Sequence, residues 1–378
     1  MCGIAAHFAY RNRPPGRDGV VRACDRMATR GPDGRGTWTS PSGTTQLGHR
    51  RLAIIDLSTD GNQPMEHADA GVTVVFNGEI YNHAELRRGL EARGHRFRSS
   101  SDTEVLLRLY VEHGADFAER LRGMFAFALW DERAGGLLLG RDPYGIKPLY
   151  VADDGRSLRA ASQVRALLAM GGVDTSPEPA GHAGFFLWGS VPEPYTLYRG
   201  IRAFPPGHTQ WVGPDGAEQP RPFATVPSLL RHAEESGGVA EPRQAVREAL
   251  LDTVRAHLVA DVEVGVFLSA GRDSTTLAAL ATEAGGRLRS VTLGFDEYAG
   301  TPNDEVPLAE AAARHYQTDH RTVRVGQREF AGLAGPFFEA MDQPTLDGLN
   351  TYLVSRAAAE TGLKVVLSGL GGDELFGG

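Results

Sequence analysis

The chain has 378 residues, of which 41% are hydrophobic and 23% are charged, with 47 glycines and 22 prolines. This composition excludes a fibrous, collagen-like or disordered protein, and the length predicts two or three domains. The 39 basic and 47 acidic residues give a net charge of −8, which argues against a nucleic-acid or membrane partner because both present negative charge.

The N-terminal stretch, residues 1–15, lacks a basic start, and its apolar run is too short for a signal peptide. No apolar stretch approaches the roughly 18 residues that a membrane-spanning helix needs, so we expect a cytoplasmic protein. The two cysteines, Cys2 and Cys24, are too few for a disulfide framework or a cysteine-based zinc site. At least one of them is expected to be a free thiol.

Residues 1–210 are expected to form one domain. Short β-rich runs bounded by Gly, Asp or Pro alternate with helical stretches that end in Gly. Paired strands with helices between them are typical of a layered α+β domain. The predicted strands are 71–77, 124–131, 136–142 and 148–153, and the predicted helices are 83–94 and 101–114.

Residues 211–242 change in character. Gly, Pro and polar residues dominate there, which predicts a linker or a loose surface segment. From residue 243 to residue 378, strands alternate with helices, which favours an α/β fold with a doubly wound parallel sheet. The predicted strands are 262–268, 290–295, 320–325 and 364–368. The predicted helices include those over 274–283, 305–315 and 351–361. A further helix before them is predicted from the apolar stripe of Val246, Leu250, Val254 and Leu258.

The chain stops at GGDELFGG, a Gly-rich loop that directly follows a predicted buried strand. A domain rarely ends at such a loop. We therefore expect residues 243–378 to be an incomplete domain, in a fragment or in a gene product that lacks a C-terminal part.

Cys2 directly follows the initiator methionine. If Met1 is removed, Cys2 carries both a thiol and a free α-amine, whose reference pKa of about 7.7–8 lies far below that of lysine. The amine can take the thiol proton and later donate a proton to a leaving amine. Taken alone, Cys2 is better explained as a small, half-buried cysteine without a role, because a lone motif has a high false-positive rate.

Further motifs follow Cys2 in order: TRGPDG (29–34), LGHRRLAIID (47–56), FNGEIYNH (76–83) and SSSDTEV (99–105). Together they resemble the glutamine amidotransferase domain of the N-terminal-nucleophile type, class II. With GMFAFALWD, GRDPYGIKPLY and FPPGH, residues 1–210 look like the glutaminase half of asparagine synthetase. The resemblance implies a four-layer αββα fold and hydrolysis of glutamine by Cys2 through a thioester.

The same resemblance implies an oxyanion hole made of Asn77 and Gly78. Attack of Cys2 on the glutamine amide forms a tetrahedral oxyanion, and an Asn side chain with the next Gly amide would stabilise it. An Asn-Gly pair is also a strong hairpin-turn signal, and residue type alone favours the turn.

Free glutamine is a zwitterion, so its pocket needs a cation and an anion. Arg51 can hold the α-carboxylate in a bidentate manner, although a surface arginine is the alternative. Glu79 and Asp102 can hold the ammonium, and Asp102 can also cap the helix that it precedes. The resemblance adds Ile54 to this glutamine-binding set.

Residues 262–281 form the order strand, small-residue loop, helix. Such a loop directs backbone N–H groups and a helix N-terminus to one point, which makes an anion site; an ordinary βα turn explains the segment equally well. No Gly-Lys-Ser/Thr follows, which disfavours a Walker loop. The loop resembles the SGGxDS signature of ATP pyrophosphatases (PP-loop type), in which Ser269, Gly271, Asp273 and Ser274 match and Ala270 replaces the usual Gly.

KVVLSGLGGDELFGG (364–378) resembles the strand and loop that close over ATP in the synthetase family. The resemblance implies Mg²⁺ ligation by Asp273 and Asp373, because the cation prefers carboxylate and phosphate oxygens; helix capping is the alternative for both. Some family members have an acidic residue at the position of Leu370, and that residue is linked to formation of the acyl-adenylate. This chain departs from them there. The resemblance also implies nucleotide contacts from Leu268, Leu293, Ser368 and Gly369.

We therefore expect a carbon–nitrogen ligase that makes asparagine from glutamine, aspartate and ATP through β-aspartyl-AMP and releases AMP and pyrophosphate. ATP and Mg²⁺ are the expected cofactors, and a homodimer is one possible assembly. Leu370 and Ala270 motivate one alternative, a related amidotransferase that amidates another carboxylate in a specialised biosynthetic pathway. The end at Gly378 motivates another, a glutaminase or nucleotide-binding fragment without complete synthetase activity.

Overall fold

The computed structural model describes residues 1–12, 16, 18–285 and 288–376. It divides into an N-terminal unit, Met1–Gly238 with Asp342–Thr345, and a C-terminal unit, Val239–Met341 with Leu346–Gly378. Each unit has its own sheets and its own apolar core. Across the described residues, no helix is both long enough and apolar enough to cross a bilayer.

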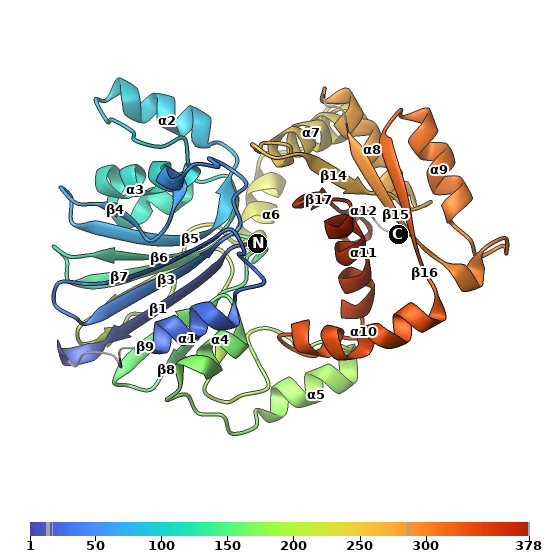
Figure 1. Ribbon diagram of the computed structural model, residues 1–378. Helices are drawn as coiled ribbons and strands as arrows, with labels where there is room; N and C mark the ends of the chain where they lie inside the picture. Colours follow the sequence, from blue (N-terminus) through green and yellow to red (C-terminus); the bar gives the residue numbers. More distant parts are fainter. Residues whose placement is uncertain (13–15, 17, 286–287, 377–378) are drawn as a thin grey trace. The chain divides into compact units, whose positions relative to one another are not determined.

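The N-terminal unit has four layers, helices, two antiparallel sheets and helices, which confirms the predicted αββα fold (Figure 1). Strand β5 (Val72–Ile80) explains the layering, since successive side chains point to opposite faces of a strand. Val74 and Phe76 pack under α2 (His83–Ala92) and α3 (Asp102–His113), whereas Val75 packs between the two sheets. Helices α1 (Gly19–Arg26) and α4 (Val164–Met170) cover the other outer face.

The first sheet has the strand order β10-β8-β9-β1-β3-β2, and the second has the order β12-β11-β7-β6-β5-β4 with β13 paired to β11. The first sheet comprises β1 (Gly3–Ala9), β2 (Gly34–Thr39), β3 (Thr45–Arg51), β8 (Tyr150–Asp153), β9 (Ser157–Ala161) and β10 (Arg202–Ala203). Besides β5, the second comprises β4 (Met65–His67), β6 (Gly123–Asp131), β7 (Gly136–Arg141), β11 (His208–Gly213), β12 (Gly216–Ala217) and β13 (Arg221–Pro222). The unit also contains α5 (Pro179–Trp188) and α6 (Val226–Glu235), and the 3₁₀ turns Tyr10–Asn12, Thr59–Gly61 and Gly114–Arg120.

Residues 211–242, expected to be a linker or a loose segment, are in part regular structure. They contain the end of β11, all of β12 and β13, and α6. Strand β11 pairs with β7 in an antiparallel register that sets Val212 opposite Leu137. Both side chains are fully buried between the sheets, and this burial holds in the sheet a segment whose local composition predicts a loop.

The C-terminal unit is built on a parallel sheet with the order β16-β15-β14-β17, which confirms the predicted doubly wound α/β fold. Val266 and Leu268 face one apolar core and Phe267 faces another, so helices cover both faces of the sheet. The strands are β14 (Val264–Phe267), β15 (Arg289–Phe295), β16 (Asp319–Val325) and β17 (Val365–Leu367). The helices are α7 (Pro242–His257), α8 (Arg272–Glu283), α9 (Val306–His315), α10 (Gln327–Ala340), α11 (Gly348–Glu360) and α12 (Gly372–Phe376), with a 3₁₀ turn at Asp296–Tyr298.

Candidate functional site

Cys2 directly precedes β1, and the pairing of β1 with β3 sets Gly3 opposite Arg50. The backbone N–H of Leu52, just beyond β3, donates to Cys2 Sγ at 3.4 Å. Arg30 Nε donates to the Cys2 carbonyl at 3.0 Å. Burial raises the pKa of the Cys2 thiol, and the hydrogen bond with Leu52 opposes this rise. Thiolate formation therefore depends on the donors and charges around the sulfur.

The amino terminus is the base that the sequence predicts for Cys2. Met1 is present in the structure, and burial lowers the pKa of its amino group to about 6. An amine with that pKa is mostly neutral at pH 7 and can accept a thiol proton. Removal of Met1 would transfer the free amine to Cys2 itself.

Asn77 and Gly78 lie within β5, so the hairpin turn that residue type alone favours is wrong. They pair with Ala126 and Phe125 of β6 in an unbroken register. Asn77 is 1% exposed, and its Nδ2 has no hydrogen-bond partner among the described residues. A buried donor left unpaired costs about 1–3 kcal/mol, so this amide is suited to a ligand. A Cβ at Gly78 would lie 2.3 Å from the Met124 carbonyl oxygen, which explains the glycine.

Two side chains from outside β5 fix the peptide that precedes Asn77. Gln63 Oε1 accepts a hydrogen bond from the Phe76 N–H at 2.6 Å, and His49 Nε2 donates to the Phe76 carbonyl at 3.2 Å. Burial lowers the pKa of His49 to about 3, so the ring is neutral near pH 7. Strand β4 pairs with β5 only as far as Val74. The two side chains therefore bond the N–H and the carbonyl of Phe76 in place of a neighbouring strand, and they orient Asn77. His49 lies within LGHRRLAIID, but its residue type alone does not predict this role.

Arg51 ends β3 and is buried, so it is not a surface arginine. Its guanidinium donates to the Ser58 carbonyl at 2.6 Å, to Asn62 Oδ1 at 2.8 Å and to the Asp56 carbonyl. These bonds use three of its five N–H donors, which leaves two for a substrate carboxylate. The same loop includes Ile54, which is half-buried. Glutamine binding by Arg51 and Ile54 stays a prediction.

Asp102 and Glu79 are the two buried carboxyls of the predicted glutamine pocket. Asp102 Oδ2 accepts a hydrogen bond from the Ile80 N–H at 2.9 Å and so links α3 to the end of β5. Ser101 caps α3, because its hydroxyl accepts from the Thr103 N–H. Burial raises the pKa of Asp102, and burial together with the Asp102 charge raises the pKa of Glu79 to about 7.

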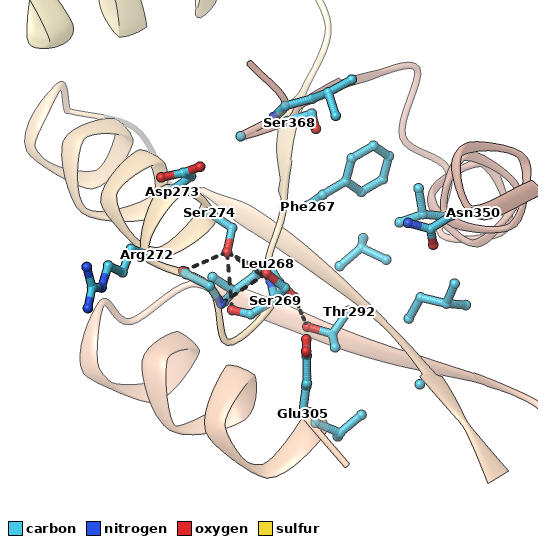
Figure 2. Close-up of a pocket in the computed structure, with 18 of the residues that line it drawn as sticks. Phe267, Leu268, Ser269, Arg272, Asp273, Ser274, Thr292, Glu305, Asn350 and Ser368 are labelled. Carbon is cyan, nitrogen blue, oxygen red and sulfur yellow. Dashed lines mark hydrogen bonds between the residues drawn. The ribbon is translucent and has the colours of Figure 1, made fainter. Parts of the chain in front are cut away.

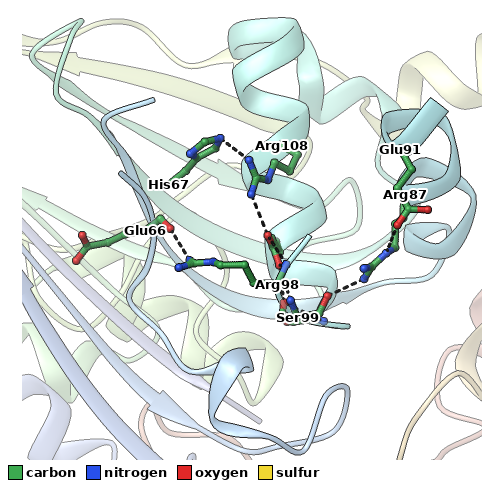
Figure 3. A network of polar contacts seen from close by, with 9 residues as sticks. Glu66, His67, Arg87, Glu91, Arg98, Ser99 and Arg108 are labelled. Atoms are coloured by element: carbon green, nitrogen blue, oxygen red, sulfur yellow. Dashed lines mark hydrogen bonds and ion pairs between the residues drawn. The ribbon is translucent and has the colours of Figure 1, made fainter. Parts of the chain in front are cut away.

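Glu104 is the centre of a polar network that fixes the loop leading into Asp102. Figure 3 shows two of its partners, Ser99 and Arg108. The Glu104 carboxylate accepts from the Ser99 N–H and hydroxyl, each at 2.8 Å, and from Arg108 at 3.1 Å. Burial alone would raise the pKa of Glu104, but these bonds outweigh it and lower the pKa. The network supports α3 structurally, and the Glu104 carboxyl is ionised in it at neutral pH.

We expect Glu104→Ala to lower the free energy of unfolding by about 3 kcal/mol, because removal of one member of a buried ionic network leaves its partners unsatisfied. The matched control is Glu91→Ala, which removes the surface pair between Arg87 and Glu91, 2.9 Å apart (Figure 3) and is expected to cost at most about 0.5 kcal/mol. Urea unfolding measures both changes. Equal losses in the two variants would contradict a structural role for the network.

In the C-terminal unit, the loop between β14 and α8 folds around Ser274 (Figure 2). Ser274 Oγ accepts from the Ser269 N–H at 3.2 Å and lies 2.9 Å from Ser269 Oγ, which itself accepts from the Gly271 N–H at 3.1 Å. Gly271 is the N-cap of α8, so Asp273 is not the capping residue. Ala270 keeps a negative φ, which removes the steric objection to an alanine there.

This loop borders a cavity of about 1030 Å³ at the carboxyl ends of β14, β15 and β17, where α/β sheets bind ligands. Asp273 lies against the second predicted loop, since a Cβ on Gly372 would fall 2.4 Å from Asp273 Oδ2. The cavity brings together all of the predicted nucleotide and metal positions: Leu268, Ser269, Gly271, Asp273, Ser274, Leu293, Ser368, Gly369 and Asp373.

Comparisons with known proteins cover both units. The glutamine amidotransferase domain family matches residues 1–223, and the asparagine synthase family matches residues 245–378. A glutamine-hydrolysing asparagine synthetase of Methanocaldococcus jannaschii, named as putative, is 30% identical over 406 residues, which span 100% of this chain and 75% of that protein. The chain belongs to the glutamine-hydrolysing asparagine synthetase family.

Other members of the family are similarly related. A putative glutamine-hydrolysing asparagine synthetase of Mycobacterium tuberculosis is 36% identical over 400 residues, which span 100% of this chain and 60% of that protein. Glutamine-hydrolysing asparagine synthetase 1 of Bacillus subtilis is 33% identical over 387 residues, which span 100% of this chain and 59% of that protein. The chain thus spans about 60% of the length of these two relatives.

The sequence motifs do not assign a role to two cationic residues that lie near Cys2. Arg30 is in the quoted motif TRGPDG and Lys147 is in GRDPYGIKPLY, yet neither motif states a role for them. Both are largely withdrawn from water, and burial lowers the pKa of each.

In the C-terminal unit, Leu370 lines the cavity beside the loop between β14 and α8 and is 82% exposed. Its side chain offers an apolar contact there and no acid–base chemistry.

Proposed function

We propose that the protein hydrolyses glutamine in its N-terminal unit and that the released nitrogen amidates aspartate in an ATP-dependent reaction of the C-terminal unit. The products would be glutamate, asparagine, AMP and pyrophosphate. The observation that carries the proposal is the Asn77 amide, buried and without a partner among the described residues, on the strand that also carries Glu79.

In the first half-reaction, the α-amine freed by removal of Met1 takes the proton of Cys2, and the thiolate attacks the amide carbon of glutamine. Asn77 Nδ2 and the Gly78 N–H stabilise the oxyanion. The protonated amine then donates to the departing ammonia, which leaves a thioester that water hydrolyses. Glu79 and Asp102 hold the ammonium of glutamine, and Arg51 holds its carboxylate.

In the second half-reaction, the loop from Leu268 to Ser274 and the loop from Ser368 to Gly372 hold ATP. Adenylation gives the acceptor carboxylate a good leaving group, which direct amidation in water lacks. The carboxylates of Asp273 and Asp373 fit Mg²⁺ that is shared with phosphate oxygens, and the bound cation would neutralise phosphate charge. The described residues contain no group of three or more metal-ligating side chains, so the ion would need the nucleotide as well.

The test uses glutamine labelled with ¹⁵N at its side-chain amide, together with aspartate, ATP and Mg²⁺. We expect labelled asparagine and pyrophosphate in equal amounts. Glutamate without either product would contradict the synthetase half. Pyrophosphate formed only when another carboxylate replaces aspartate would contradict aspartate as the acceptor.

A further inference from the structure

Lysine is almost absent from this chain. Of the 39 basic residues, only Lys147 and Lys364 are lysines. Lys364 is exposed, whereas Lys147 is 6% exposed in the loop after β7 of the N-terminal unit. A buried ammonium costs desolvation energy, and arginine replaces lysine nearly everywhere else in the chain. The buried lysine therefore calls for a specific reason.

The backbone of Lys147 is held from both sides. The fully buried Asp142 accepts from the Lys147 N–H at 3.0 Å, and the same oxygen accepts from the Phe125 N–H at 3.1 Å. Arg141 Nε donates to the Lys147 carbonyl at 3.0 Å. Phe125 lies opposite Gly78 in the register of β6 with β5. The loop is thus fixed to the strand that pairs with the predicted oxyanion glycine.

The Lys147 ammonium acts on groups that come from several elements. Glu79 of β5 and Cys2 before β1 stabilise its charge, as does Asp142 of its own loop, and Arg30 after α1 opposes it. The field is reciprocal, since Lys147 also acts on the amino terminus.

Glu79 is the carboxyl that this charge affects most directly. Lys147 and the amino terminus favour ionisation of Glu79, whereas the charge of Asp102 on α3 opposes it. Beyond β5, burial and then the Glu79 charge raise the pKa of Tyr81. Two buried carboxyls close to each other cannot both stay ionised at neutral pH unless a cation compensates them. Lys147, whose backbone is held beside β6, supplies a cation that meets this need.

We infer that Lys147 is a positioning residue of the glutaminase site, whose ammonium keeps Glu79 ionised so that Glu79 can bind the α-ammonium of glutamine. The inference rests on the proposed glutaminase reaction. Arginine would supply a charge of different shape, whereas lysine places a compact ammonium at the end of a flexible stem. Without this cation, Glu79 holds its proton to higher pH and loses its attraction for the substrate.

The test compares Lys147→Met, Lys147→Arg and the control Lys364→Met, each assayed for glutamine hydrolysis between pH 6 and 9 (roughly the range over which a carboxyl with a pKa near 7 titrates). Wild type and the control should lose activity as pH falls through about 7, where Glu79 protonates. Lys147→Met should move this acidic limb up by about one pH unit and raise the KM about fivefold at pH 7, with a smaller effect on kcat. Lys147→Arg should move the limb back toward the wild-type position.

Glu79→Gln provides a second test that does not depend on the folding of the Lys147 variants. The amide that replaces the carboxyl cannot titrate, so activity should be low and the acidic limb should keep only the ionisation of the terminal amine, without the one near pH 7. An acidic limb in Glu79→Gln that coincides with the wild-type limb, or a Lys147→Met profile that coincides with the wild type, would overturn the inference. An equal fall of glutamine hydrolysis in both Lys147 variants, without a shift of the acidic limb, would also overturn the inference, because this result indicates a structural role for Lys147. Absence of hydrolysis in wild type and Lys364→Met would instead refute the proposed function.

Discussion

Cys2→Ala is expected to lower glutamine hydrolysis by roughly 10⁴-fold or more, because removal of a catalytic nucleophile leaves only the contribution of binding and oxyanion stabilisation. Glutamate release measures this loss. Formation of product from added ammonia should persist, since ammonia enters the proposed reaction after the step that needs the thiol. Binding of ATP to the C-terminal unit should also be unchanged.

Cys24→Ala is the matched control for Cys2→Ala. Cys24 lies on α1 and is fully buried against the first sheet, and burial raises the pKa of its thiol to about 11. Its loss should cost about 1 kcal/mol of stability through a small cavity and leave glutamine hydrolysis intact. Equal loss of glutamine-dependent and ammonia-dependent activity in Cys2→Ala would contradict separate sites for the two half-reactions.

Asn77→Ala is expected to slow glutamine hydrolysis by about 100–1,000-fold, a loss of about 2.7–4 kcal/mol of transition-state stabilisation. The fall should appear in kcat with little change in KM, because the oxyanion exists only after Cys2 attacks. Steady-state glutamate release at several glutamine concentrations separates the two constants.

The fold should tolerate Asn77→Ala well, since Asn77 Nδ2 has no hydrogen bond to lose among the described residues. Thermal unfolding provides this control. A fall in kcat of less than tenfold, or a fall accompanied by a large loss of stability, would contradict the assignment of Asn77 to the oxyanion hole.

The strands that local patterns predict well are those with large apolar side chains in alternation. Residues 124–131 form β6 because Phe125 and Phe127 face the helices while Ala126 and Ala128 face the other sheet. Strand β1, by contrast, is not among the expected strands. Its sequence GIAAHFA has one β-branched residue, and the strand is fixed by long-range pairing with β3 and β9, which local propensity does not register.

The site residues divide in the same way. Asn77 and Gly78 favour a turn by residue type, and only the long pairing of β5 with β6 makes them part of a strand. The motifs predicted the PP-loop positions that line the cavity, because the order strand, loop, helix is local. The contacts of His49 and the role proposed for Lys147 depend on burial and on neighbours distant in sequence, so no spacing pattern reveals them.

The proposed glutaminase reaction requires a mature protein that begins with Cys2 and uses the Cys2 thiolate to attack glutamine. The most direct measurement is the intact mass of the purified protein before and after treatment with a diazoketone analogue of glutamine. We predict a mass that lacks Met1 and gains one adduct, which peptide mapping locates on Cys2 and not on Cys24. A protein that retains Met1 and gains no adduct would contradict the account.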